Sequence, residues 1–169
     1  MFLLQMAGFP GSGKSTIARL IAKNTNSIVI DRDIIKNSML SSGIEGQLLA
    51  DASYIVTFDL AAYYLEQGIS VIIDTPCYYK ETVDKGLELC KEYKSVYKYI
   101  ECKVDSYEEI ERRIKYRKHL ATQISETTRD IYNNSLNKSV KPIDIHSLEI
   151  NTTSDKHYDM NVILSYMNL

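Results

Sequence analysis

The sequence has few cysteines, no long apolar run and almost no excess charge. Its three cysteines, Cys77, Cys90 and Cys102, form no CxxC pair and cannot all be bridged with one another. We therefore expect free thiols and a reducing compartment. No stretch approaches the roughly 18–20 apolar residues of a membrane-spanning helix. The formal net charge of −2 does not call for nucleic acid or an anionic membrane as partner. These features predict a cytoplasmic protein with no membrane partner.

The N-terminal stretch MFLLQMAGFPGSGK is apolar but lacks the basic segment and the cleavage site of a secretory signal. It is better explained as a buried strand that ends at glycine. The chain has 169 residues, of which 44% are hydrophobic and 25% charged, as in globular proteins. Since no repeat or linker divides it, we expect one domain, residues 1–169.

Short apolar runs alternate with helical patterns from end to end. We expect strands at 2–7, 27–30, 70–74, 96–104 and 146–153. We expect helices at about 13–23, 33–40, 46–68, 80–93, 106–120, 125–136 and 154–167, the last capped by Ser154 or Asp155. Apolar residues surround much of the segment 46–68, which predicts that it is well buried. The alternation predicts an α/β sandwich with a mostly parallel sheet.

The segment GFPGSGKS, residues 8–15, fits G-x-x-x-x-G-K-[ST] at every fixed position. Its glycines allow close backbone approaches, so that successive N–H groups can surround a phosphate at a helix N-terminus. A strand before the motif and a helix after it favour a nucleotide site over a chance turn. The predicted cofactors are ATP and Mg²⁺. The residues expected to contact them are Gly8, Pro10, Gly11, Ser12, Gly13, Lys14, Ser15 and Thr16, with Lys14 on the β- and γ-phosphates and the Ser15 hydroxyl on Mg²⁺.

Acids follow two of the apolar runs. Asp74 ends the run VIID. Because ligands bind at the carboxyl ends of parallel strands, Asp74 would lie in the same crevice as the phosphate loop and is a candidate to bind Mg²⁺ directly or through water. An ordinary turn residue is the alternative. The stretch IVIDRDIIK holds Asp31 and Asp33. Asp33 is either the N-cap of a helix that begins at Ile34 or a base for an acceptor hydroxyl. Asp31 is best explained as a strand-end or turn residue.

GFPGSGKSTIARLIAKN followed by DRDIIKNSM resembles the P-loop kinases of the polynucleotide kinase type. The resemblance implies a three-layer α/β fold of the P-loop NTPase class, with strand order 2-3-1-4-5 and a helical lid at about 112–126. It implies that Asp33, the acid of the pair Arg32–Asp33, is the base. It places Lys36 on the acceptor side, where the family usually has Arg, a residue whose bidentate contact Lys cannot make. The match covers nearly the whole kinase domain but is detailed only in the first 40 residues, and Pro76 stands where an Asn is usual. No D-x-D-x-T motif appears, so the phosphatase domain of some family members is not expected.

The segment RRIKYRK, residues 112–118, is strongly basic. On a helix Arg113 and Arg117 would share one face, and small P-loop kinases use lid arginines to neutralise charge on the transferred group. By resemblance we expect Arg117 and then Arg113 to bind the nucleotide phosphates. A solvated face paired with nearby glutamates, or a nucleic-acid groove, is the alternative.

Three further groups have weaker support. Tyr78 and Tyr79 could stack on an acceptor but are better explained by chance placement, since the chain has 13 tyrosines. The resemblance places the adenine near residues 151–153. His119, His146 and His157 show no metal-binding spacing.

Together these features predict an ATP-dependent phosphotransferase. Lys14, Asp33 and Arg117 would be catalytic, and Asp33, Lys36 and Asp74 would face the acceptor. Ser15 and Asp74 would bind Mg²⁺. The acceptor would be a hydroxyl compound, either a polynucleotide 5′ end or a small molecule such as a nucleoside or a sugar. The alternative from another class is an ATP-binding or ATP-hydrolysing switch protein without a small acceptor.

Overall fold

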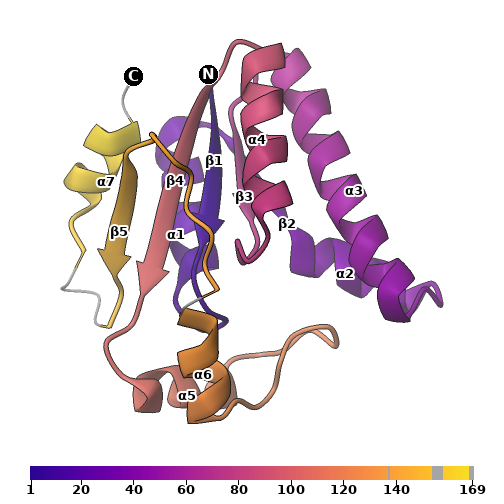
Figure 1. Ribbon diagram of the computed structural model, residues 1–169, viewed down its shortest axis with the longest axis vertical. Coiled ribbons are helices and arrows are strands. Elements are labelled where there is room, and N and C mark those ends of the chain that lie inside the picture. The colour runs from indigo at the N-terminus through magenta and orange to yellow at the C-terminus, as the bar shows by residue number, and fades with distance from the viewer. Residues whose placement is uncertain (137, 154–157, 168–169) are drawn as a thin grey trace.

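The computed structural model describes residues 1–136, 138–153 and 158–167. Within them one sheet is formed by β1 (Phe2–Ala7), β2 (Ile28–Asp31), β3 (Val71–Asp74), β4 (Val96–Lys103) and β5 (Ser147–Asn151). The strand order is β2-β3-β1-β4-β5 (Figure 1), and all neighbouring strands are parallel. The predicted sheet and its order, 2-3-1-4-5, are confirmed.

The described helices are α1 (Lys14–Thr25), α2 (Arg32–Ser41), α3 (Gly46–Glu66), α4 (Lys80–Glu92), α5 (Tyr107–Tyr116), α6 (Arg129–Leu136) and α7 (Met160–Met167). Three differ from expectation. The helix expected at 154–167 begins at Met160, since the described residues 158 and 159 are not helical. The helix expected at 106–120 ends at Tyr116, because Arg117 is extended, with φ −75° and ψ 153°. The segment 125–128 precedes α6 instead of belonging to it. Ser154 and Asp155, the expected caps of the last helix, lie outside the described residues.

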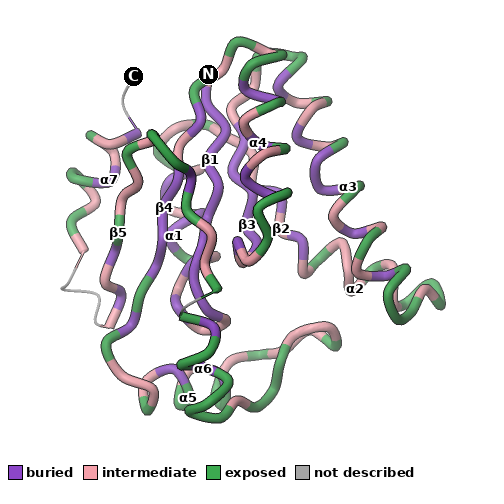
Figure 2. The backbone as a smooth tube through the Cα atoms, in the orientation of Figure 1, coloured by how far each residue is buried: buried purple, intermediate pink, exposed green. Residues whose placement is uncertain are grey.

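Two apolar layers enclose the sheet, because alternate residues of each strand point to opposite faces. Leu3 and Ile73 pack with residues of α3 and α4 on one face. Leu4 and Ile72 pack with residues of α1 and α7 on the other. All of β1 is buried, and in Figure 2 the central strands are almost continuously buried. The predicted three-layer sandwich is therefore present.

The expectation that residues 46–68 are well buried was wrong. α3 packs on the sheet along one side only, through residues such as Phe58 and Leu65. Leu48 and Ile55 on its other side are 66% and 61% exposed. α3 lies at the edge of the molecule (Figure 1). The apolar composition of a helix does not reveal how many of its sides are covered.

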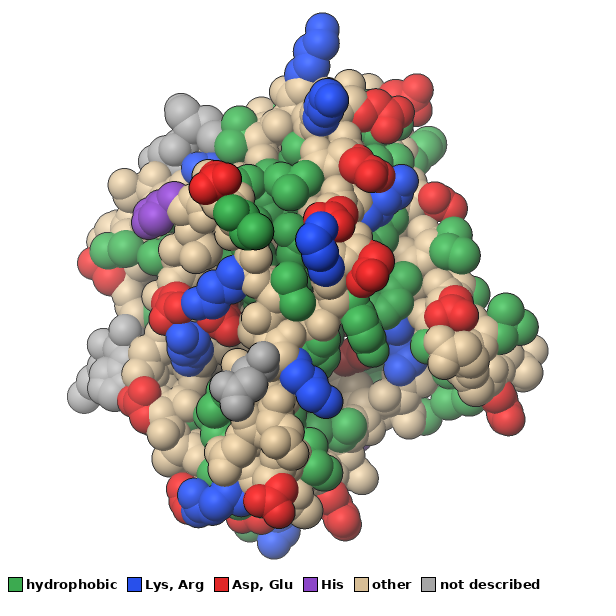
Figure 3. Space-filling model, in the orientation of Figure 1, with side chains coloured by type: hydrophobic (Ala, Val, Ile, Leu, Met, Phe, Trp, Pro, Cys, Tyr) green, Lys and Arg blue, Asp and Glu red, His purple; other side chains and the backbone are tan. Residues whose placement is uncertain are grey.

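Because neighbouring strands are parallel, the carboxyl ends of all five lie at one edge of the sheet. In Figure 1, α5 and α6 lie beyond the ends of β1 and β4. On the face drawn in Figure 3, acidic and basic side chains are interspersed without a large patch of one sign. No described helix combines the length and the apolar character that a bilayer crossing requires.

Candidate active site

The glycine-rich loop connects β1 to α1 and depends on two glycines. Gly8 has φ +128°, and a Cβ there would lie 2.3 Å from the carbonyl oxygen of Cys102 in β4. Gly13 precedes α1 with φ +84°, and a Cβ there would lie 3.3 Å from Thr152 Oγ1. A side chain would be strained at both positions. The loop can therefore pack against β4 and the end of β5. The N–H groups of Thr16 and Ile17 donate to the carbonyl oxygen of Gly13, whereas those of Lys14 and Ser15 precede the first hydrogen bond of α1, and both residues line an adjoining cleft.

This cleft has a volume of about 730 Å³. Eight lysine or arginine side chains line it, against the carboxylates of Asp33 and Asp74. Such an excess of positive charge favours an anionic ligand. The predicted site residues that line the cleft are Pro10, Gly11, Gly13, Lys14, Ser15, Thr16, Asp33, Lys36, Asp74, Arg113 and Arg117.

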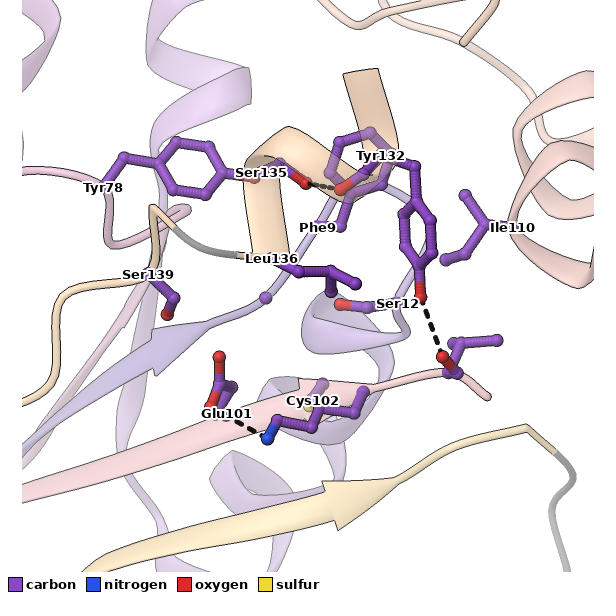
Figure 4. Close-up of a pocket in the computed structure, with 13 residues that line it drawn as sticks. Phe9, Ser12, Tyr78, Glu101, Cys102, Ile110, Tyr132, Ser135, Leu136 and Ser139 are labelled. Atoms are coloured by element: carbon purple, nitrogen blue, oxygen red, sulfur yellow. Dashed lines mark hydrogen bonds and ion pairs between the residues drawn. The ribbon is translucent and has the colours of Figure 1, made fainter. Parts of the chain in front are cut away.

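Gly8 and Ser12 do not line the cleft but border a separate cavity of about 20 Å³ (Figure 4). Tyr78 points toward Ser135 at this cavity, and burial raises the pKa of Tyr78 to about 12. Tyr79 is 56% exposed. Since neither tyrosine is among the cleft-lining residues, the structure gives no support to stacking on an acceptor there.

Lys14 and Asp74 form the buried floor of the cleft, with exposed fractions of 8% and 5%. Lys14 Nζ donates a hydrogen bond to the carbonyl oxygen of Phe9 at 3.1 Å. Burial lowers the pKa of Lys14, and the charge of Asp74 opposes this change. Burial raises the pKa of Asp74, and Lys14 and the Ser15 hydroxyl oppose that change. Each charge thus reduces the cost of burying the other.

The floor also has the chemistry of a magnesium site. Asp74 Oδ2 is buried without a hydrogen-bond partner among the described residues. A carboxylate oxygen and the hydroxyl of Ser15 are oxygen ligands of the kind that Mg²⁺ takes. No group of three or more His, Cys, Asp or Glu among the described residues, which include His119 and His146 but not His157, could hold a metal ion. Phosphate and water oxygens would have to complete the coordination.

The structure shows which of Asp31 and Asp33 caps the helix that follows β2. Asp31 ends β2 directly opposite Asp74 of β3, and its Oδ1 accepts a hydrogen bond from the N–H of Asp33 at 3.0 Å. Asp31 is therefore the N-cap, and α2 begins at Arg32. The interpretation of Asp33 as the cap of a helix beginning at Ile34 was wrong. Its carboxylate instead faces the cleft.

The loop between α5 and α6, residues 117–128, reaches across the cleft to α2. Gln123 Nε2 donates a hydrogen bond to Asp33 Oδ2 at 2.8 Å. Thr122 Oγ1 donates to the carbonyl oxygen of Asp33 at 3.3 Å, and the N–H of Ala121 donates to Asn37 Oδ1 at 3.1 Å. We call this segment the α5–α6 loop.

The two predicted lid arginines have different surroundings. Arg113 in α5 donates to the carbonyl oxygen of Thr153 at 3.2 Å and to that of Gly11 at 3.4 Å, and it pairs with Glu109 at 2.6 Å. It thereby ties the phosphate loop to the segment after β5. Arg117 lies beyond the helix end, so the two do not share one helical face as expected. Burial lowers the pKa of Arg117, and Asp33 opposes this change.

Comparison with known proteins identifies the family. A model of the AAA domain family matches residues 3–139. The chain belongs to this family. No curated protein sequence matches the chain.

Several solved structures resemble this AAA domain. A putative kinase from Chloroflexus aurantiacus J-10-fl has a TM-score of 0.77 at 18% identity, covering 98% of this chain and 92% of that one. The APS kinase of Mycobacterium tuberculosis, solved with AMPPNP and APS, has a TM-score of 0.67 at 14% identity, covering 98% and 96%. A gluconokinase from Sinorhizobium meliloti 1021 has a TM-score of 0.59 at 15% identity, covering 96% and 87%. At identities this low, the TM-scores establish a shared fold and nothing beyond it.

Arg32 and Gln123 also line the cleft, although the sequence predicted no role for either. Arg32 is 9% exposed and stacks on the ring of Tyr54, with its guanidinium carbon 3.6 Å from the ring centroid. It donates to the carbonyl oxygen of Ala50, but its buried Nε has no partner among the described residues. The pair Arg32–Asp33 was visible in the sequence, whereas the stacking of Arg32 on Tyr54 and the hydrogen bond of Gln123 to Asp33 are tertiary contacts without a local sequence pattern.

Proposed function

We propose that this AAA domain is a kinase that transfers the γ-phosphate of Mg-ATP to a hydroxyl acceptor. One observation carries the proposal: the carboxylate of Asp33 is not used as a helix cap and lies in the same cleft as Lys14 of the phosphate loop. A nucleotide-binding switch needs the loop alone. A kinase also needs a group that can accept the proton of the attacking hydroxyl.

The donor half of the cleft would bind the polyphosphate. The loop amides at the start of α1 surround the β-phosphate, and Lys14 neutralises charge on the β- and γ-phosphates. Ser15 and Asp74 would hold Mg²⁺, which would neutralise charge on the phosphate oxygens when bound. Arg117 would approach the γ-phosphate from the α5–α6 loop. Direct phosphate binding by Arg113 stays a prediction, since it would require Arg113 to exchange hydrogen bonds that now hold Gly11 and Thr153.

The transfer step then follows from the position of Asp33. The acceptor oxygen attacks Pγ, and its proton passes to the carboxylate of Asp33. The bond between Pγ and the β,γ-bridging oxygen breaks, and its electron pair stays on ADP. Little covalent chemistry is required of the protein beyond orientation and charge neutralisation.

The acceptor end of the cleft is positively charged. Lys36 lines it, and burial, followed by the charge of Arg32, lowers the pKa of Lys36. The free Nε of Arg32 adds a buried donor. These groups support an acceptor that carries negative charge near its hydroxyl. A 5′-hydroxyl polynucleotide, as the resemblance implies, and a small acidic hydroxyl compound both meet this description.

A transfer screen with γ-³²P-labelled ATP tests the proposal. The acceptors are a 5′-hydroxyl oligonucleotide, a nucleoside, a neutral sugar and a sugar acid such as gluconate, each against water alone. We expect label to enter at least one negatively charged acceptor. Arg32→Gln should reduce that transfer while leaving the KM for ATP unchanged. Hydrolysis that no acceptor accelerates would favour the ATPase alternative and overturn the proposal.

A further inference from the structure

The side-chain amide of Gln123 is held at both ends. Its Nε2 donates to Asp33 Oδ2 at 2.8 Å, and its Oε1 accepts a hydrogen bond from the N–H of Leu120 at 3.3 Å. Only the amide nitrogen can donate to an ionised carboxylate, and only the amide oxygen can accept from a backbone N–H. The two partners therefore determine the orientation of the amide without ambiguity.

This contact fixes one oxygen of the Asp33 carboxylate. Within the described part of the chain, the hydrogen bonds to the Asp33 side chain engage Oδ2 and leave Oδ1 without a protein partner. A hydrogen bond to an ionised carboxylate is stronger than one between neutral groups, because the acceptor carries a charge. With Oδ2 occupied, Oδ1 is the oxygen left to meet an acceptor in the cleft.

The same loop carries the predicted phosphate-binding arginine. Arg117 Nη2 donates to the carbonyl oxygen of Ile124 at 3.0 Å, so Arg117 is bonded to the residue that follows Gln123. Ala121 and Thr122 also bond to α2, the helix that carries Asp33. One short segment therefore links the arginine on the donor side to the carboxylate on the acceptor side.

We propose that Gln123 is a positioning residue for Asp33. It orients the carboxylate so that Oδ1 receives the acceptor proton while Arg117 of the same loop neutralises the γ-phosphate. Placement of the loop over the cleft then completes both halves of the site together, which couples proton transfer to nucleotide engagement. This inference rests on the proposed kinase function, because it needs Asp33 to be the base.

The test is a double-mutant cycle with Mg-ATP as donor and water as acceptor, so that the natural acceptor need not be known. Gln123→Leu should lower kcat about 10- to 100-fold, the usual worth of a hydrogen bond to a charged group, and leave the KM for ATP within about twofold. Gln67→Leu is the matched control, because Gln67 is exposed and, among the described residues, its Nε2 bonds only to the carbonyl oxygen of Tyr63. The control should retain wild-type kcat.

The cycle separates positioning from loop packing. In an Asp33→Asn background, followed through its residual hydrolysis of labelled ATP, Gln123→Leu should change kcat by less than about twofold, since there is no base left to orient. A Gln123→Leu effect that persists in this background, or that raises the KM for ATP and leaves kcat unchanged, would overturn the inference. If Asp33→Asn alone leaves the rate unchanged, the base assignment itself is wrong, whereas a loss with Asp33→Asn and none with Gln123→Leu defeats only the positioning role.

Discussion

Asp31 Oδ1 accepts a hydrogen bond from the N–H of Asp33 at 3.0 Å. This short contact assigns the two acids of the stretch DRD to different tasks. Asp31 caps α2 by accepting a hydrogen bond from a free N–H group at the start of the helix. The carboxylate of Asp33, two residues further on, is not used for capping and lines the cleft. Neither residue could serve both purposes, because a capping carboxylate is directed at its own helix rather than at a ligand.

The capping role predicts the effect of replacing Asp31. Asp31→Ala should lower the free energy of unfolding by about 0.5–2 kcal/mol, the usual cost of a lost N-cap. Asp31→Asn should cost much less, since Asn caps as well as Asp. Urea denaturation of the three proteins measures this difference. Equal stability of the Ala and Asn variants would show that the side chain does not act as a cap.

Burial of Asp74 predicts a gain in stability when its charge is removed. Its pKa in the folded protein is raised above the ordinary value of 3.8, chiefly by burial. The folded state therefore holds this proton more tightly than the unfolded chain does. The corresponding stabilisation is complete below about pH 3.8 and is lost as the pH rises through the folded-state pKa.

In the Asp74→Asn variant the side chain cannot ionise, so the variant does not lose this stabilisation as the pH rises. Without nucleotide, it should be more stable than the wild type at pH 7, and the difference should shrink toward pH 4. Phosphate transfer should at the same time fall about 100-fold or more, because the magnesium side of the site is lost. Urea denaturation at the two pH values and the transfer assay measure both effects. A variant that is less stable than the wild type at pH 7 would contradict this account of Asp74.

The sequence was sufficient for the fold because its signals are local. Apolar runs and amphipathic segments predicted all five strands, and the phosphate loop was recognisable from eight residues. The sheet order came from the family resemblance and not from the periodicity. The end of α5 was missed, because nothing in the residues before Arg117 stops a helix. That boundary depends on the contacts of the α5–α6 loop with α2.

The candidate site was predicted only in part for the same reason. Lys14, Asp33 and Asp74 follow strands whose ends must meet at one edge of a parallel sheet, so their proximity could be inferred. Gln123 reaches Asp33 across 90 positions of sequence, and Arg32 stacks on Tyr54 of another helix. Such pairs have no spacing rule and become visible only in the folded chain.

Arg117 is expected to act on the transferred phosphate. Arg117→Ala should lower kcat for transfer at least 100-fold, as loss of a charge-neutralising arginine does, and leave the fold intact. Arg129→Ala is the control, because Arg129 is exposed, pairs with Glu108 and is not among the residues that line the cleft. Steady-state kinetics of both variants test the assignment, and equal kcat values would remove Arg117 from the catalytic set.

Arg113 is expected to contribute mainly to stability. Arg113→Ala removes donors to Gly11 and Thr153 and leaves Glu109 with Arg112 alone, so the free energy of unfolding should fall by about 2–3 kcal/mol. The Kd for ATP should rise because the phosphate loop loses its tie to the end of β5. Thermal unfolding with and without ATP measures both effects. A variant of wild-type stability that no longer binds ATP would instead indicate direct phosphate binding.

The base assignment is tested most directly by Asp33→Asn. The substitution keeps the size of the side chain and one oxygen that can still accept from Gln123, but it removes the carboxylate that takes up the proton. Calorimetric titration should give a Kd for Mg-ATP within a few-fold of the wild type, while transfer of labelled phosphate to the best acceptor in the screen falls at least 1,000-fold, the upper part of the usual range for a general base. Transfer that survives within a few-fold would contradict the account and leave Asp33 as a residue that lines the cleft without taking part in the reaction.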